Sequence, residues 1–174
     1  YIQELSFIPS KVEELLNAQV EKEGYSSLLY LAMASWAENK GYSGISEWLF
    51  AQADEEKNHM LEFIHFINDR GGKALVPGFK KPPGDYNNIN QLFNDVMSHE
   101  QFITASINDI VALCVDERDF TTQNWLQGFV AEQIEEEASV QAILDRLNLV
   151  GENNLYMFDR DIMSMRAAPS ADEA

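Results

Sequence analysis

A-D-E-E-K-N-H-M, residues Ala53 to Met60, places Glu56 and His59 three positions apart in a segment that reads as a long helix. Residues at this spacing lie on one face of a helix. Leu49 and Phe63 fall on the same face at helical spacing, so this face is expected to be the buried one. A carboxylate buried without a partner is strongly destabilising. The stretch therefore predicts a helix whose buried face carries a polar group that needs a counter-charge.

Capping and stop signals predict four long helices and a short fifth one. The expected helices cover about residues 10–39, 43–70, 88–115, 121–150 and 155–165. Ser10 to Glu13 and Asn88 to Gln91 read as capping boxes, and Ser43 or Ser46 can cap the second helix. Residues 73–88 contain three of the five prolines and must form a long connection.

This order of helices predicts an all-α fold, namely an antiparallel four-helix bundle with one long crossover and a short C-terminal fifth helix. The short connections pair neighbouring helices, while the long second connection lets helices two and three run parallel. Residues 1–174 are expected to form a single domain, with the bundle at about 11–150, the fifth helix at about 155–165 and a disordered tail at 166–174.

The core-facing seam of each long helix carries a carboxylate near its middle. Residues at alternating spacings of three and four define these seams, and the seam of helix two ends with Phe63 and Phe66. The four seam carboxylates are Glu23, Glu56, Glu100 and Glu136. No Lys or Arg occupies a central seam position, so a metal is the simplest counter-charge. Four carboxylates and one imidazole provide the donors for two divalent cations.

At these motifs the chain closely resembles the non-haem ferritins of the bacterial and archaeal type. The matching stretches are E-K-E-G-Y-S-S-L-L-Y at 21–30, E-E-K-N-H at 55–59, H-E-Q at 99–101 and E-Q-I-E-E-E at 132–137. The resemblance covers about residues 11–165. It implies an iron-storage protein with ferroxidase activity, which oxidises Fe(II) with dioxygen or peroxide and stores it as a ferric mineral. It also implies self-association into a hollow cage, in this family usually of about 24 copies.

The resemblance implies a role for each matching residue. The first iron would be held by Glu23, Glu56 and His59, and the second by Glu56, Glu100 and Glu136, with Glu56 bridging. Gln133 and Tyr30 would lie beside the pair, Tyr30 as an electron donor. Ligands of a third iron on the cavity side match Glu55, Glu132 and Glu135, with Glu136 shared.

Related classes make different demands on the sequence. A bacterioferritin would need a second Glu-x-x-His in helix four and a haem-ligating Met beside the bridging Glu, but Glu135 and Lys57 stand at these positions, so no haem is expected. A rubrerythrin would need a Cys-x-x-Cys domain, and Cys114 is the single cysteine. A di-iron oxygenase that acts on small molecules, or a purely structural bundle with a polar core, remains as an alternative.

Charge and cysteine content limit the partners. The 29 acidic and 12 basic residues give a net charge of -17, which argues against nucleic acid or an anionic membrane as a partner and suits cations. Asp116, Glu117 and Asp119 are candidates for a cation channel or a solvated loop. The lone cysteine favours a reducing compartment, so a cytoplasmic location is expected, while a targeting peptide before Tyr1 stays open.

Overall fold

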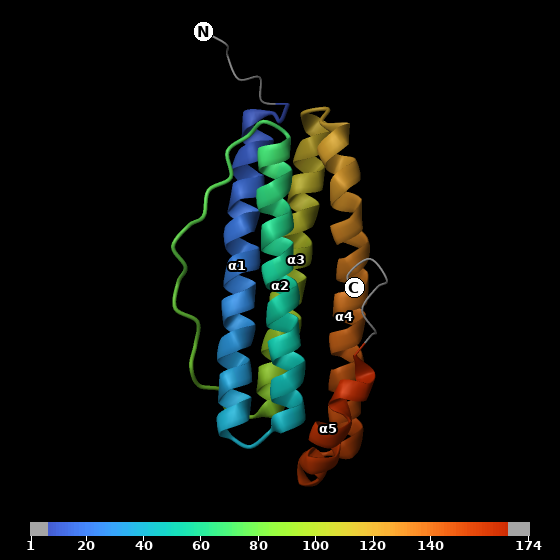
Figure 1. The fold of residues 1–174 in the computed structure, drawn as a ribbon. Coiled ribbons are helices and arrows are strands. Elements are labelled where there is room, and N and C mark those ends of the chain that lie inside the picture. Colours follow the sequence, from blue (N-terminus) through green and yellow to red (C-terminus); the bar gives the residue numbers. More distant parts are fainter. Residues whose placement is uncertain (1–6, 167–174) are drawn as a thin grey trace.

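The computed structural model describes residues 7–166 and confirms the predicted bundle. Its elements are α1 (Ser10–Asn39), α2 (Ser43–Asp69), α3 (Ile89–Asp116), α4 (Phe120–Val150), η1 (Glu152–Asn154), α5 (Leu155–Asp161) and η2 (Ile162–Met165). Figure 1 shows the connection from α2 to α3 returning along the outside of the bundle, so that α2 and α3 run in the same direction. None of the helices within residues 7–166 is long and apolar enough to cross a membrane.

Side-chain caps begin two of the long helices. Asn88 precedes α3, and its Oδ1 accepts a 2.8 Å hydrogen bond from the backbone N of Gln91, as the capping box predicts. The Gln91 side chain donates to Asp95 instead of returning to Asn88, so half of the box is formed. Asp119 caps α4 by accepting from the backbone N of Thr122 at 3.1 Å. This helix therefore starts one residue before the predicted Thr121.

The predicted capping box at Ser10 is not formed. Pro9 takes the cap position of α1, and no side chain caps this end. Glu13 turns instead toward the start of the crossover, where its Oε1 accepts from the backbone N of Lys73 at 2.6 Å. A tertiary hydrogen bond has thus replaced the local one.

The predicted serine cap of α2 is also wrong. Tyr42 stands at the cap position without a side-chain hydrogen bond to the helix. The Ser46 hydroxyl donates to the carbonyl oxygen of Ala34 at 3.1 Å, which joins α2 to the last turns of α1. The serine is therefore used between helices, and the first turn of α2 is capped from α5 instead, where Asp159 Oδ1 accepts from the backbone N of Ile45.

Positive backbone angles end the helices where the sequence predicted stops. Gly41, Gly71 and Gly151 have φ values of 89°, 79° and 69°, in the left-handed region that glycine enters without a steric cost. Arg118, with φ 57°, takes this conformation between α3 and α4.

The buried apolar residues form two clusters with a polar layer between them. Phe93 and Leu147 belong to one cluster, and Phe63 and Leu126 to the other. On every long helix, the polar seam residues lie between the parts that enter the two clusters. These polar residues are Glu23 on α1, Glu56 and His59 on α2, Glu100 on α3, and Gln133 with Glu136 on α4.

The end of the α2 seam differs from the prediction by one residue. Ile67 is fully buried, whereas the predicted Phe66 is partly buried and stacks on Trp125 with ring centroids 4.0 Å apart. Both residues are apolar and adjacent, so small helix rotations decide which one faces the core.

Gly24 lets the crossover approach α1 beside the polar layer. A Cβ at this position would lie 2.5 Å from the Phe79 ring and 2.8 Å from the sulfur of Met60. Such distances are too short for any side chain, so glycine is required for this packing and not for a bend in the helix. Gly24 is thus a contact point for the crossover.

Candidate metal centre

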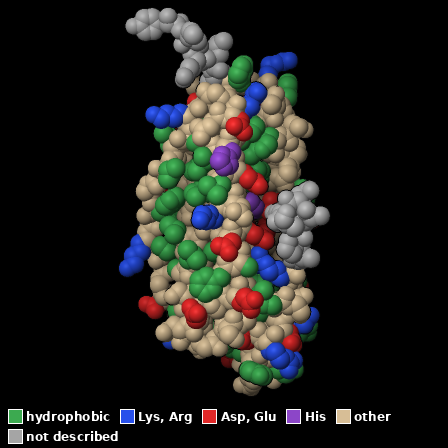
Figure 2. Space-filling model, viewed as in Figure 1, with side chains coloured by type: hydrophobic (Ala, Val, Ile, Leu, Met, Phe, Trp, Pro, Cys, Tyr) green, Lys and Arg blue, Asp and Glu red, His purple; other side chains and the backbone are tan. Residues whose placement is uncertain are grey.

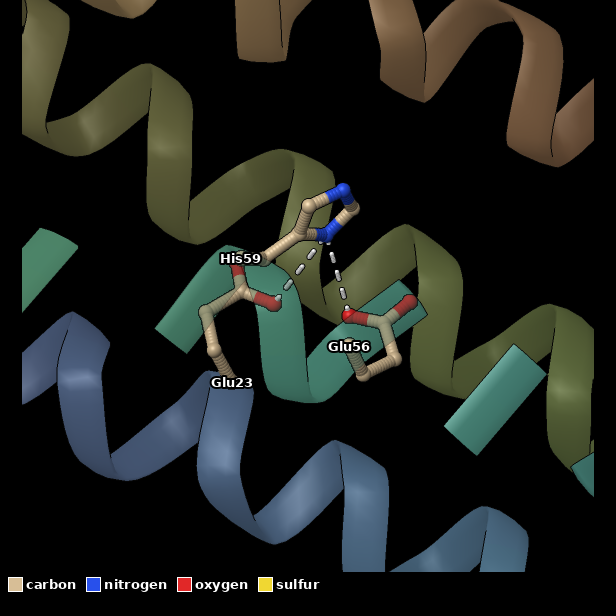
Figure 3. Close-up of side chains that lie close together, drawn as sticks. All are labelled: Glu23, Glu56 and His59. Atoms are coloured by element: carbon tan, nitrogen blue, oxygen red, sulfur yellow. Dashed lines mark ion pairs between the residues drawn. The ribbon is translucent and has the colours of Figure 1, made fainter. Parts of the chain in front are cut away.

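Glu23, Glu56 and His59 converge in the polar layer from two helices. Figure 3 shows the Glu23 carboxylate from α1 and the Glu56 carboxylate from α2 both facing the His59 ring. The Nδ1 atom of His59 lies 3.4 Å from Glu56 Oε2 and 3.9 Å from Glu23 Oε2. Among the described residues, this is the one group of three potential ligands whose donor atoms all lie within 4.8 Å of one another. The structure thus brings together the three residues assigned to the first iron.

Glu23 has one satisfied and one unsatisfied oxygen. Its Oε1 accepts from Gln19 Nε2 at 3.0 Å, and Gln19 in turn accepts from Ser106 at 2.7 Å. Its Oε2 is buried without a hydrogen-bond partner. Burial raises the pKa of Glu23 well above its ordinary value, and the nearby Glu56 raises it further. An oriented carboxylate with a free buried oxygen fits a metal ligand, because a cation would satisfy it.

His59 is held by carboxylates on both ring nitrogens. Its Nε2 lies 2.9 Å from Glu132 Oε1 on α4, opposite the contacts of Nδ1. Burial lowers the pKa of His59, but the hydrogen bonds to Glu132 and Glu56 outweigh it, and the pKa is raised well above its ordinary value. The Phe129 ring packs edge-on against the imidazole with centroids 5.6 Å apart. The imidazole is therefore held between carboxylates of α1 and α2 on one side and of α4 on the other.

Glu100 reaches the same layer from α3 and is held by two donors. The Tyr30 hydroxyl on α1 donates to its Oε1, and Gln133 Nε2 on α4 donates to its Oε2 at 3.1 Å. Burial raises the pKa of Glu100, although both hydrogen bonds act in the opposite direction. Tyr30 and Gln133 thus lie directly beside Glu100, a predicted ligand.

Glu136 approaches from α4 at the partly exposed side of the layer. Its Oε2 accepts from Gln52 Nε2 at 2.8 Å. Burial, followed by the charges of Glu100 and Glu55, raises its pKa to about 8. At neutral pH this carboxyl group keeps its proton for most of the time, so a cation that binds here displaces a proton.

The residues assigned to a third iron are engaged elsewhere. Glu55 pairs with Arg166, whose Nη2 lies 2.7 Å from Glu55 Oε1. Glu132 contacts His59, as above, and Glu135 is exposed. Figure 2 shows acidic side chains gathered along the border between α2 and α4, the part of the surface nearest to this side of the layer. The third iron site stays a prediction.

Three supporting residues carry no role in the sequence interpretation. Gln19 stands four residues before Glu23, a spacing at which side chains meet on a helix, so this contact had a local signal. Gln52 stands four residues before Glu56 on α2, and the sequence interpretation assigned it no partner. Arg166 belongs to the part assigned to a tail, and nothing local predicts where its side chain goes; residues 167–174 of that tail lie outside the described part.

A four-helix bundle with one crossover, whose middle layer gathers carboxylates and an imidazole, defines the class of ferritin-like carboxylate proteins. The model of the ferritin-like domain matches residues 13–150 of this chain. The chain belongs to the ferritin family, as the resemblance of its motifs indicated.

Its relatives include bacterial non-haem ferritins. The bacterial non-heme ferritin of Campylobacter jejuni is 37% identical over 160 residues, which cover 91% of this chain and 96% of that protein. A probable bacterial non-heme ferritin-like protein of Haemophilus influenzae is 35% identical over 157 residues, covering 89% of this chain and 95% of that protein. Among solved structures, an open pore ferritin from the archaeon Archaeoglobus fulgidus matches with a TM-score of 0.89 and 37% identity, over 94% of this chain and 100% of that one.

Proposed function

We propose that the protein is an iron-storage ferritin that oxidises Fe(II) at the polar layer and stores the product as a ferric mineral. The observation that carries this proposal is the buried group of Glu23, Glu56 and His59, with one Glu23 oxygen that has no hydrogen-bond partner. Membership of the ferritin family supports the same activity.

Two Fe(II) ions are the substrate, and five residues would bind them. Glu23, Glu56 and His59 take the first ion, and Glu56, Glu100 and Glu136 take the second. Glu56 would belong to both sets. It faces His59 directly, and the charge of Glu100 helps to raise its pKa. Oxygen-rich ligands suit Fe(III) better than Fe(II), so this donor set favours loss of an electron.

The reaction takes one electron from each Fe(II). With dioxygen as oxidant, two electrons and two protons give hydrogen peroxide and leave two Fe(III); with peroxide as oxidant, the same two electrons and two protons give two waters. The carboxyl groups of Glu23, Glu100 and Glu136, whose pKa values are raised, lose protons as the ions bind. Tyr30 donates a hydrogen bond to Glu100 and would also donate a further electron, and Gln133 keeps the other Glu100 oxygen oriented.

Storage requires a container, and we propose self-association into a hollow cage of about 24 copies. Membership of the ferritin family supports this, whereas the seven-residue α5, too short to fold alone, packs on its own bundle. Within the chain, Phe158 is buried, and Asp159 Oδ1 accepts from the backbone N of Ile45 at 2.9 Å. The solved relative is itself described as an open pore ferritin.

One combined experiment tests the proposal. The mass of the purified protein is measured by light scattering, and Fe(II) is then added in air while absorbance of the ferric product is followed. A large assembly that gives a rapid absorbance rise with two Fe(II) per chain is the expected result. A monomer or dimer as the only species would contradict the cage, and protein that contains no iron and gives no rise would favour a purely structural bundle. The cytoplasmic location stays a prediction.

A further inference from the structure

Arg166 brings a positive charge from the segment after η2 to the middle of α2. It follows η2, and its side chain is only 17% exposed. The guanidinium pairs with Glu55 at 2.7 Å and donates to Gln52 Oε1 at 3.3 Å. It also lies 5.7 Å from the centre of the Trp48 ring, a cation–π distance. A 3.4 Å hydrogen bond to the carbonyl oxygen of Trp48 is the fourth contact, and together these contacts hold the long side chain in one orientation.

The residues of α2 that contact Arg166 lie on the same face of the helix as the predicted metal ligands. Trp48, Gln52, Glu55 and His59 follow one another at spacings of four, three and four, which places them along one face. Arg166 therefore lies at one end of the proposed metal centre. The sequence places no Lys or Arg at the centre of a long-helix seam, so this charge is supplied from outside the bundle helices.

Gln52 links Arg166 to a predicted iron ligand. A guanidinium can only donate hydrogen bonds, so it fixes the Oε1 side of the Gln52 amide toward itself. The Nε2 side is then directed at Glu136, where it donates to Oε2 at 2.8 Å. If Arg166 were absent, the amide would be free to turn and present its oxygen to Glu136.

Glu55 is the residue for which Arg166 and a metal would compete. It is one of the three carboxylates that match ligands of a third iron, and in this structure its Oε1 contacts the guanidinium. A carboxylate that pairs with Arg in a partly buried setting is neutralised in the same way as one that binds a cation.

We propose that Arg166 is a positioning residue, whose guanidinium takes the place of a third cation at Glu55 and orients Gln52 toward Glu136. This inference rests on the metal centre of the proposed function. While Arg166 is in place, the assembly binds two divalent cations per chain at high affinity and keeps the Glu55 end closed to a third.

The test is an anaerobic titration of the purified assembly with Co(II), followed by calorimetry and by the absorption spectrum of the bound metal. The parent is expected to bind two Co(II) per chain. Arg166→Gln removes the charge, so we expect one additional Co(II) per chain, bound at least about tenfold more tightly than any third Co(II) of the parent. The spectrum of the first two ions should also change, because Glu136 loses its oriented donor.

Three further variants separate this role from a general structural one. Arg166→Lys keeps the charge and should stay at two Co(II) per chain. The double variant Arg166→Gln with Glu55→Gln removes the freed ligand and should return to two. Arg160→Gln is the matched control, because Arg160 is exposed, pairs with Asp161 in the same C-terminal segment and carries the same charge. It should behave as the parent.

The outcomes separate failure of the Arg166 proposal from failure of the metal centre itself. If Arg166→Gln binds two Co(II) with the spectrum of the parent, Arg166 has no role at the centre. If the parent itself binds three, Arg166 does not close the Glu55 end. A gain of Co(II) in Arg166→Lys, or one that persists in the double variant, also overturns the inference. A parent that binds no Co(II) at all overturns the metal centre, and with it both proposals.

Discussion

The Tyr30 hydroxyl on α1 donates a hydrogen bond to Glu100 Oε1 on α3, across the centre of the bundle. Burial and the charges of Glu100 and Glu56 raise the pKa of Tyr30 well above its ordinary value, so this hydroxyl remains a donor at neutral pH. A predicted ligand and a predicted electron donor are thus joined directly. The contact makes Tyr30 part of the support of the site, whether or not it also donates an electron.

Tyr30→Phe removes this donor and leaves Glu100 with Gln133 as its remaining side-chain partner. The expected cost to the free energy of unfolding of the metal-free protein is about 1 to 2 kcal/mol, the usual effect of removing one partner of a buried hydrogen bond. Oxidation of the first two Fe(II) per chain should still occur, but more slowly. Urea denaturation followed by circular dichroism measures the first effect, and stopped-flow absorbance measures the second.

Tyr86→Phe is the control, because its hydroxyl donates to the Pro83 carbonyl oxygen in the exposed crossover. This surface change should cost no more than about 0.5 kcal/mol. Equal losses of stability in the two variants would mean that the Tyr30 contact is not special to the site.

Glu23→Gln should stabilise the metal-free protein and prevent binding of the first ion. The glutamine has the same shape, and its oxygen can still accept from Gln19. It carries no charge, and its amide group can donate a hydrogen bond from the position of the unpartnered Glu23 Oε2. The expected gain in the free energy of unfolding at neutral or slightly alkaline pH is about 1 to 3 kcal/mol.

The control for this change is Glu21→Gln, on the same helix but exposed. It should alter neither stability nor metal binding. A loss of stability in Glu23→Gln would show that the Glu23 charge has a structural partner, and rapid iron oxidation by this variant would remove Glu23 from the ligands.

Zn(II) added before Fe(II) should suppress the rapid oxidation. Sites with nitrogen and oxygen ligands bind Zn(II) more tightly than Fe(II), and Zn(II) has no electron to give. Glu23, Glu56 and His59 supply such a ligand set. The initial rate of ferric absorbance measures the effect, with Mg(II), which prefers oxygen ligands and keeps its waters, as the control. An unchanged initial rate in excess Zn(II) would place the oxidation elsewhere in the protein.

The middle layer could be predicted because its signals are local and repeat on every helix. Glu56 and His59 lie three residues apart, and the other carboxylates fall on seams that apolar residues define on both sides. Asn88 was recognisable as a cap for the same reason, since its partner is three residues away. Agreement in depth among the helices then turned separate weak signals into one predicted site.

The remaining contacts join residues that are distant in the sequence. Ser46 donates to a carbonyl of the preceding helix, and Glu13 accepts from the crossover. Tertiary hydrogen bonds have thus formed in place of the two predicted local caps. Arg166 meets Gln52 across a separation of 114 residues. No periodicity extends over such a distance, so only the packed structure reveals that Arg166 reaches α2 beside the candidate metal centre.

The metal-free protein should lose stability as pH rises. Burial raises the pKa of Glu136 from 4.5 to about 8, so between these values the folded chain keeps a proton that the unfolded chain has lost. The folded state then binds more protons, and the free energy of unfolding falls as pH rises through this window. His59 acts in the same direction: its raised pKa gives a contribution that is fully present below pH 6.5 and is lost as pH rises through the folded value. Urea denaturation of the metal-free protein between about pH 5 and about pH 8 measures this slope.

Two comparisons test whether this slope of unfolding free energy against pH comes from the polar layer. Glu136→Gln should flatten it, since the glutamine has no proton to lose, whereas Glu47→Gln on the exposed face of α2 should leave it unchanged. Zn(II)-loaded protein should show the opposite trend, because bound metal requires deprotonated carboxylates and therefore stabilises more strongly at higher pH. A metal-free stability that is constant or rises over this range would mean that the carboxylates of the layer are ionised and paired, and a metal would then not be needed to balance them.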